Sequence, residues 1–164
     1  MVFVPNVEIV RASAEDASTI LDLQLLAYQS EAALYNDWSL PPLQQTLADL
    51  IGEFATTVFL KACIEGTLIG SVRAKPCGTG CEIGRLIVHP DHQRRGLGRR
   101  LMYAIESLCN STRYELFTGA RSEGNIRLYE SLGYRAFRTL AVAPHVTLVY
   151  MEKTGLHHPS LIIL

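Results

Sequence analysis

Apolar residues recur along the chain with two periods, one typical of strands and one typical of helices. Residues 7–12 (VEIVRA) predict a short strand, and Ser13 is placed to cap a helix that follows it. The apolar positions after that cap recur at helical spacing: Ile20, Leu23, Ala27 and Leu34. They predict that residues 14–35 are largely helical. Pro41 and Pro42 suit the start of a second helix, which we expect over residues 43–54.

The remaining two thirds of the chain predict a sheet with two further helices. Two β-rich runs, joined at Glu65-Gly66-Thr67, predict a hairpin over residues 57–75. Residues 81–90 predict a further strand, and its apolar end suggests that this strand is buried on both faces. The later elements are a helix with Leu97, Leu101, Ile105 and Leu108 on one face, a strand at 114–120, a short helix at 122–133, and strands at 135–140 and 145–153. This order, β-α-α-β-β-β-α-β-α-β-β, predicts an α/β (α+β) fold with a mixed sheet and helices on its faces.

Composition narrows the class of protein without identifying it. The 164 residues are enough for one domain with a real core, and the hydrophobic fraction of 48% is ordinary for a globular protein. The formal net charge of −1 does not indicate a general nucleic-acid-binding surface, and no apolar run is long enough to cross a membrane. We therefore expect neither a nucleic acid nor a membrane as a partner.

Four cysteines raise the question of disulfides and metal: Cys63, Cys77, Cys81 and Cys109. No N-terminal signal pattern precedes them, so we expect reduced thiols and a cytoplasmic location. Cys77 and Cys81 form a single C-x-x-x-C pair, whereas a structural zinc site needs four ligands. The five histidines show no ligand spacing either: His89, His92, His145, His157 and His158. We therefore assign no metal.

The stretch HPDHQRRGLGRRLM, from His89 to Met102, concentrates positive charge and flexible backbone between a strand and a helix. Its glycines, Gly96 and Gly98, let a ligand approach the backbone, and the first N–H groups of the helix carry the positive end of its dipole. Four arginines add full charge: Arg94, Arg95, Arg99 and Arg100. These features suit a phosphate or pyrophosphate group, and a solvated basic helix start is the alternative. The Walker sequence and the third glycine of the dinucleotide fingerprint are both absent.

The same stretch carries a family resemblance. Q-R-R-G-L-G, from Gln93 to Gly98, resembles the Q/R-x-x-G-x-G/A signature of the GNAT N-acetyltransferase superfamily. RLIVHPDHQRRGLGRRLM as a whole is similar to that family's acyl-CoA motif, including the strand and the His-Pro before the loop. NIRLYESLGYR, from Asn125 to Arg135, resembles the family's second, C-terminal motif. The order of elements matches the family from Val7 to Glu152, most weakly at 28–54 and 154–164.

The resemblance implies a fold and an activity. The fold would be a domain over 1–153, followed by a tail over 154–164. Its twisted, mostly antiparallel sheet would have about seven strands and about four helices, and would be splayed at the acyl-CoA site. The activity would be direct transfer of an acetyl group from acetyl-CoA to a primary amine of a small molecule or protein. A non-catalytic acyl-CoA-binding or regulatory module on this fold is the alternative. A nucleic-acid-binding domain is disfavoured by the balanced charge and the lack of stacking aromatics.

The resemblance also implies where coenzyme A binds. Its phosphates would rest on the loop amides of Arg94, Arg95, Gly96, Leu97, Gly98 and Arg99. The pantetheine arm would pair like an added strand with the backbone of Leu86, Ile87 and Val88. Asn125, one turn before Tyr129, is placed to hydrogen-bond the arm. Many members instead carry an asparagine seven residues before the tyrosine, where this chain has Ser122.

Acetyl transfer needs a neutral amine, a stabilised oxyanion and a proton for the departing thiolate. A lysine amine has a pKa of about 10.4, so roughly one in 2,500 is neutral at pH 7, and a base is useful. The resemblance assigns Glu82 as the base, with Glu115 or water as alternatives, and Tyr129 as the acid. The Val88 N–H would stabilise the oxyanion. In the non-catalytic interpretation, Glu82 is an exposed residue at the start of a strand, and Tyr129 is an aromatic residue that only packs its helix against the core.

In this fold the acceptor site lies between the first two helices and the sheet. The residues expected there are Tyr28, Glu31, Tyr35, Asp37 and Trp38. Aromatic rings together with carboxylates suit an amine or cationic acceptor. In the alternative interpretation, the tyrosines are ordinary core residues and the acids are solvated surface residues. The expected partners are thus acetyl-CoA and an amine acceptor, and assembly into a homodimer is left open.

Overall fold

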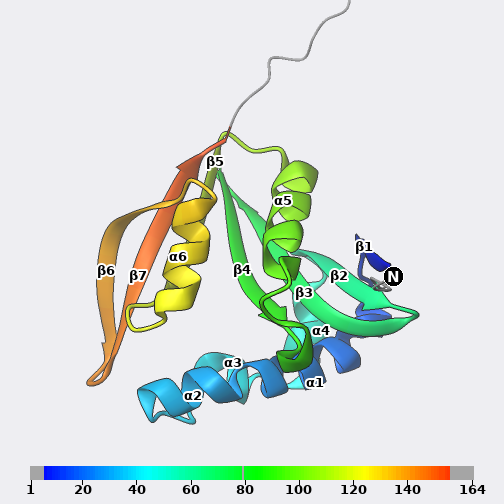
Figure 1. The fold of residues 1–164 in the computed structure, drawn as a ribbon, viewed down its shortest axis with the longest axis horizontal. Coiled ribbons are helices and arrows are strands. Elements are labelled where there is room, and N and C mark those ends of the chain that lie inside the picture. Colours follow the sequence, from blue (N-terminus) through cyan, green and yellow to red (C-terminus); the bar gives the residue numbers. More distant parts are fainter. Residues whose placement is uncertain (1–5, 79, 156–164) are drawn as a thin grey trace, which may run out of the picture.

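The computed structural model describes residues 6–78 and 80–155 and places seven strands of these ranges in one sheet, in the order β1-β2-β3-β4-β5-β7-β6 (Figure 1). The strands are β1 Val7–Arg11, β2 Val58–Ile64, β3 Thr67–Cys77, β4 Gly80–Val88, β5 Arg113–Gly119, β6 Arg135–Ala143 and β7 Val146–Thr154. All neighbours are antiparallel except β4 and β5, which are parallel. The predicted mixed, mostly antiparallel sheet is confirmed. The expected tail from residue 156 on, with His157 and His158, lies outside the described residues.

Six α-helices and two short 3-10 helices accompany the sheet in the described ranges. They are η1 Ala14–Asp16, α1 Ala17–Ala27, α2 Gln29–Tyr35, α3 Pro41–Gln44, α4 Leu47–Glu53, η2 Pro90–His92, α5 Leu97–Cys109 and α6 Glu123–Ser131. Each of the two helices expected before residue 55 is thus divided. Tyr28 separates α1 from α2, and extended backbone at Gln45 separates α3 from α4. Thr46 is the N-cap residue of α4, and its Oγ1 accepts a hydrogen bond from the Asp49 N–H at 3.1 Å.

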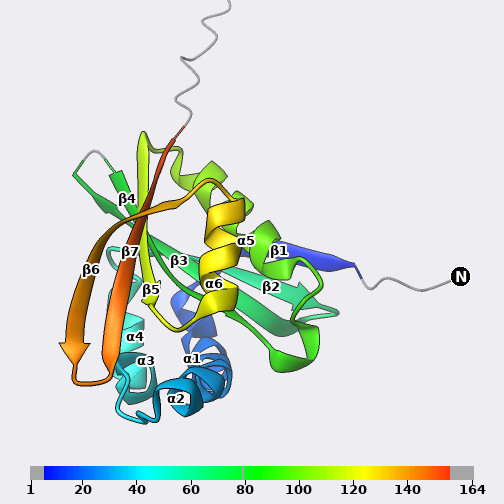
Figure 2. The same ribbon diagram turned by 60° about the vertical axis from the view of Figure 1, so that its left-hand side comes forward.

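The core forms on both faces of the sheet because adjacent strand residues point to opposite sides. Leu60 belongs to the larger cluster, under α5, whereas its neighbour Phe59 belongs to a smaller cluster with α1 and α4. The buried stripe of α5 consists of Leu97, Leu101, Met102 and Ile105. In Figure 2, α5 and α6 run beside the strands, and α1 to α4 gather at the lower end of the molecule.

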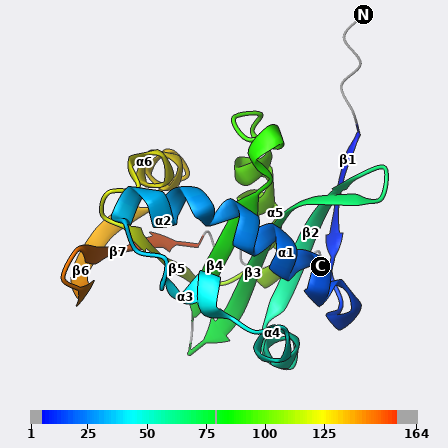
Figure 3. The ribbon, with the colours of Figure 1, turned by 90° about the horizontal axis from the view of Figure 1, so that it is seen from below.

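The sheet opens at its centre. β4 and β5 pair only through Cys81 with Tyr114 and Glu82 with Glu115. Beyond these two pairs the strands diverge, and the remaining length of β4 has no partner on its β5 side (Figure 1). α1 and α2 cross this open end, so that α2 lies next to the start of α6 (Figure 3). The predicted splay is therefore present, and it sets the place of the candidate site.

Candidate active site

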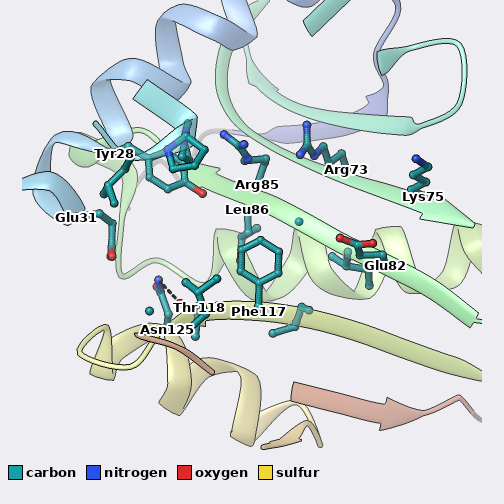
Figure 4. A pocket seen from close by; sticks show the side chains of 18 of the residues that line it. Tyr28, Glu31, Arg73, Lys75, Glu82, Arg85, Leu86, Phe117, Thr118 and Asn125 are labelled. Carbon is teal, nitrogen blue, oxygen red and sulfur yellow. Dashed lines mark hydrogen bonds between the residues drawn. The ribbon is translucent and has the colours of Figure 1, made fainter. Parts of the chain in front are cut away.

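The divergence of β4 and β5 creates a cavity of about 500 Å³, a size typical of small-molecule sites. β3, β4, β5 and α6 line it together with the segment from Tyr28 to Pro42. The polar side chains in its lining include Tyr28, Glu31, Arg73, Lys75, Glu82, Arg85, Thr118, Asn125 and Tyr129. In Figure 4, Asn125 and Thr118 lie across this cavity from Tyr28 and Arg85. We call this space the β4–β5 cavity.

The backbone of β4 turns peptide groups toward the opened gap. Hydrogen-bonded positions alternate in an antiparallel pair, and the His89 N–H donates to the Ile69 carbonyl of β3 at 2.7 Å. The Val88 N–H and C=O therefore point away from β3, and the Val88 carbonyl accepts a hydrogen bond from Gln93 Nε2 at 3.1 Å. Ile87 pairs with Ser71 and its side chain is buried. An added strand would thus find the Val88 peptide group on the open side.

The loop after β4 leads directly into the start of α5. Gly96 is the N-cap residue with φ +79°, and Arg94 has φ +62° although it carries a side chain. The first four N–H groups of a helix have no partner within the helix, so this end is suited to bind an anion. Arg94 and Arg95 are exposed, whereas Arg99 Nη2 donates to Ser131 Oγ at 2.7 Å. The geometry combines backbone donors with mobile positive charge.

Asn125 and Tyr129 reach the β4–β5 cavity from α6. Asn125 Nδ2 donates to Thr118 Oγ1 at 3.3 Å, which fixes the amide against β5. Tyr129 is only 8% exposed and also packs in the main core, so its ring is both a core element and part of the cavity wall. Burial raises the pKa of Tyr129, and the hydroxyl therefore stays protonated at neutral pH. A protonated hydroxyl at this place can act as an acid.

The two carboxylates considered as bases have different surroundings. Glu82 is an exposed residue that lines the β4–β5 cavity near the point where the strands diverge. Glu115, its cross-strand partner, accepts a hydrogen bond from Arg113 Nη1 at 2.7 Å and is not part of the lining. The geometry favours Glu82.

The residues expected at the acceptor site divide into two groups. Tyr28, Glu31 and Tyr35 line the β4–β5 cavity. Trp38 is 54% exposed and lies outside the lining, and Asp37 accepts hydrogen bonds from the backbone and side chain of Ser39 in a turn. The structure therefore does not bring Asp37 and Trp38 into the lining: Asn36, in the left-handed conformation, ends α2, and the chain returns to the cavity only at Leu40.

Several polar cavity residues were not assigned to the site by the sequence analysis, and four of them matter most for the charge and shape of the cavity. They are Arg73, Lys75, Arg85 and Thr118. Arg73 forms an ion pair with Glu53 of α4. Arg85 carries the one signal that the sequence offered, since it is a charged residue inside the apolar run EIGRLIV. Charged side chains are rarely buried unless they are paired or functional.

Two surveys of the described residues bear on metal and membranes. No group of three or more histidine, cysteine, aspartate or glutamate side chains in the described ranges is arranged to hold a metal ion. None of the helices in those ranges combines the length and the hydropathy needed to span a membrane. The four cysteines are free thiols.

Comparisons with known proteins agree with this geometry. Residues 19–134 match the model of the acetyltransferase (GNAT) family. The UPF0157 protein YqkA of Bacillus subtilis is 28% identical over 128 residues, which are 77% of this chain but only 37% of that protein. The chain thus spans little more than a third of that relative.

Solved structures share the fold at low sequence identity. The PaiA N-acetyltransferase of Thermoplasma acidophilum, in complex with coenzyme A, has a TM-score of 0.76 at 19% identity, covering 91% of this chain and 99% of that chain. The ribosomal-protein-S18-alanine N-acetyltransferase of Escherichia coli has a TM-score of 0.77 at 15% identity, covering 97% and 100%. The chain belongs to the acetyltransferase (GNAT) family.

Proposed function

We propose that this protein moves the acetyl group of acetyl-CoA directly to a primary amine of a small molecule or protein. One observation carries the proposal: a single cavity at the β4–β5 divergence holds an acid, Tyr129, and a carboxylate, Glu82. The unpaired side of β4 and the positively charged start of α5 adjoin it. The ribosomal-protein-S18-alanine N-acetyltransferase of Escherichia coli, which shares this fold, supports a protein amine as one of the possible acceptors.

We place coenzyme A along β4 and at the start of α5. The loop amides of Arg94, Arg95, Gly96, Leu97, Gly98 and Arg99 would bind its phosphates. The pantetheine arm would lie along the open side of β4 at Leu86, Ile87 and Val88, and Asn125 would hold it from α6. The complex of the Thermoplasma protein with coenzyme A supports this placement by its similar fold.

The proposed reaction forms a C–N bond and breaks the C–S bond of the thioester. Glu82 accepts a proton from the acceptor ammonium, directly or through water, and frees the amine lone pair to attack the carbonyl carbon. The Val88 N–H donates to the oxygen that becomes negative. Tyr129 protonates the departing sulfur, and the second proton of the amine nitrogen, released as the C–S bond breaks and the amide forms, returns to the Tyr129 oxygen directly or through water. Tyr28, Glu31 and Tyr35 form the wall against which the acceptor would lie.

Three further features are part of the proposal. The catalytic domain would span residues 1–153, and the protein would be cytoplasmic, since its thiols are free. A homodimer would use the edge strand β6, where Phe137, Leu140 and Val142 are exposed. Light scattering after gel filtration would report the mass of the assembly.

An acceptor screen tests the central proposal. Purified protein is incubated with acetyl-CoA and a panel of small amines, amino acids and peptides, and free thiol release is recorded. Binding of acetyl-CoA is measured by calorimetry in parallel. We expect both binding and amine-dependent thiol release. Binding without thiol release for any amine in the panel would refute catalysis and favour a binding module.

A further inference from the structure

Arg85 occupies an irregular position in β4. Ser71 pairs with Ile87 and Arg73 pairs with Gly84, so one residue of β3 faces both Arg85 and Leu86. This extra residue is a β-bulge, which re-aims a side chain out of the strand's alternation. Arg85 has φ +49°, an uncommon value for a residue with a side chain. Its guanidinium carbon lies 5.9 Å from the centre of the Tyr28 ring, on the wall of the β4–β5 cavity (Figure 4).

The Arg85 guanidinium is incompletely paired. Its Nη1 atom is buried and has no hydrogen-bond partner among the residues that the structure describes. Burial lowers the pKa of Arg85, although a guanidinium remains protonated at neutral pH. A buried hydrogen-bond donor without a partner is unfavourable. The position therefore has the property of a subsite that awaits an anion.

The neighbouring charges do not fill this role. Arg73 is ion-paired with Glu53. Glu31 accepts a hydrogen bond from Ser122 Oγ at 2.6 Å, on the α6 side of the cavity. Glu82 lies three residues before Arg85 in β4, where β4 and β5 still pair. The cavity thus offers a free cation at Arg85 and a carboxylate at Glu82, which together complement a zwitterion.

We propose that the acceptor is an amine that also carries a carboxylate, and that Arg85 binds this carboxylate. The inference rests on the proposed function, because it names the substrate class of the same site. The planar fork of a guanidinium matches a carboxylate with two parallel hydrogen bonds. Lys75 lines the same cavity and adds positive charge. A phosphoryl group shares part of this chemistry, but its second negative charge would need another free donor beside Arg85. Arg73 is already paired with Glu53, and Lys75 lies nearer to Glu82 than to Arg85 (Figure 4).

Matched acceptors test the inference. Amino acids are compared with their carboxamides, and β-alanine with phosphoethanolamine, by thiol release with acetyl-CoA. We expect kcat/KM to be about 100-fold higher for the carboxylate than for the amide, the size of a hydrogen-bonded charge pair. Arg85→Gln should reduce this preference to about threefold or less, and Arg85→Lys should retain part of it. Arg138→Gln, on exposed β6, is the matched control and should keep the full preference.

A binding measurement separates failure of the inference from failure of the proposed function. Amino acids and amides are titrated calorimetrically into protein saturated with coenzyme A, where no turnover occurs. Binding of the acid alone, lost in Arg85→Gln, supports the subsite even if the thiol assay is negative. Equal turnover or equal binding of the acid and the amide overturns the inference. A preference for phosphoethanolamine over β-alanine overturns it too. So does a loss of kcat/KM in Arg85→Gln that is equal for the acid and the amide. No binding of any amino acid overturns it as well.

Discussion

The hydroxyl oxygens of Tyr35 and Ser122 lie 3.0 Å apart, although 87 positions separate the two residues. The Arg121 N–H donates to the Tyr35 oxygen at 2.9 Å, and Ser122 Oγ donates to Glu31. The Tyr35 O–H must then donate to Ser122, and the three bonds form one directed chain between the segment that joins β5 to α6 and α2. A Cβ atom on Gly119 would overlap the Tyr35 hydroxyl, which shows how closely the two segments approach. This chain holds the acceptor side of the cavity to the helix that carries Asn125 and Tyr129.

Breaking this chain should destabilise the fold cooperatively. Tyr35→Phe and Ser122→Ala each leave a buried partner unsatisfied, so each should lower the free energy of unfolding by about 1–3 kcal/mol. The double variant should lose less than the sum, because the second substitution removes a group that the first has orphaned. Urea unfolding measures all three. Ser30→Ala, on the exposed side of α2, is the control, and strict additivity of the two single losses would contradict a shared chain.

The two loop glycines should respond differently to alanine. Gly96 has φ +79°, which costs a residue with a side chain about 1–2 kcal/mol. A Cβ on Gly98 would lie 3.5 Å from Leu128 and 3.7 Å from Leu86, which is ordinary contact. Gly96→Ala should therefore lower the stability and weaken acetyl-CoA binding at least tenfold, about 1.4 kcal/mol. Gly98→Ala should change the stability by less than about 0.5 kcal/mol.

Urea unfolding and calorimetry with acetyl-CoA check these expectations. Gly98→Val, with a branched side chain, should weaken acetyl-CoA binding at least tenfold while the fold stays intact. If Gly96→Ala and Gly98→Val both bind as the wild type does, the loop is not the phosphate site.

The parts of the site that follow from local sequence could be predicted, and those that depend on strand register could not. The stripe of α5 and the glycine loop before it are local patterns. The structure buries Leu97, Leu101 and Ile105 as expected, whereas Leu108, in the last turn of the helix, is 47% exposed. The bulge at Arg85 arises only when β3 pairs with β4, and the pattern of apolar and polar residues along the sequence does not predict it. Tyr28, which divides the first predicted helix, lies under the guanidinium of Arg85, a contact between distant segments that the local sequence does not indicate.

Ser122 shows the same limit from another side. The sequence predicts a short helix that begins near Ser122, and the residue is the N-cap of α6. Its side chain makes no capping bond, because it turns instead to α2, 87 positions earlier in the chain. A sequence can indicate the local role of a serine, but not which distant residue its side chain binds in place of the local backbone.

Removing the Tyr129 hydroxyl should separate catalysis from binding. Tyr129→Phe keeps the ring in the core, so the fold and the affinity for acetyl-CoA should hardly change. If the hydroxyl protonates the thiolate, kcat should fall about 100-fold or more. Single-turnover thiol release and calorimetry measure the two quantities. A rate within about threefold of wild type would leave Tyr129 as a packing residue only.

Alkaline pH should destabilise the protein through its buried tyrosines. Burial raises the pKa of Tyr28, Tyr114, Tyr129 and Tyr134 above the ordinary value. Above about pH 10 the unfolded chain therefore loses protons that the folded chain retains, and the free energy of unfolding falls as the pH rises. Below that pH these groups contribute no pH dependence. Urea unfolding from neutral pH upwards, with tyrosinate absorbance, measures the effect, and a stability that rises with pH in this range would contradict it.

Charge removal at Glu82 distinguishes a base from an electrostatic attractant. Glu82→Gln keeps the shape of the side chain. If Glu82 accepts the amine proton, kcat/KM should fall about 100-fold at neutral pH and recover partly toward about pH 9.5, where more of the acceptor is already neutral. If Glu82 only attracts a cationic acceptor, KM should rise instead, and the defect should shrink at high salt because exposed charges are screened. Glu115→Gln, whose carboxylate Arg113 holds, is the matched control and should leave both profiles unchanged. We expect the first pattern, since Glu82 lines the cavity. If the ratio of the Glu82→Gln rate to the wild-type rate changes with neither pH nor salt, the proton transfer is assigned to water.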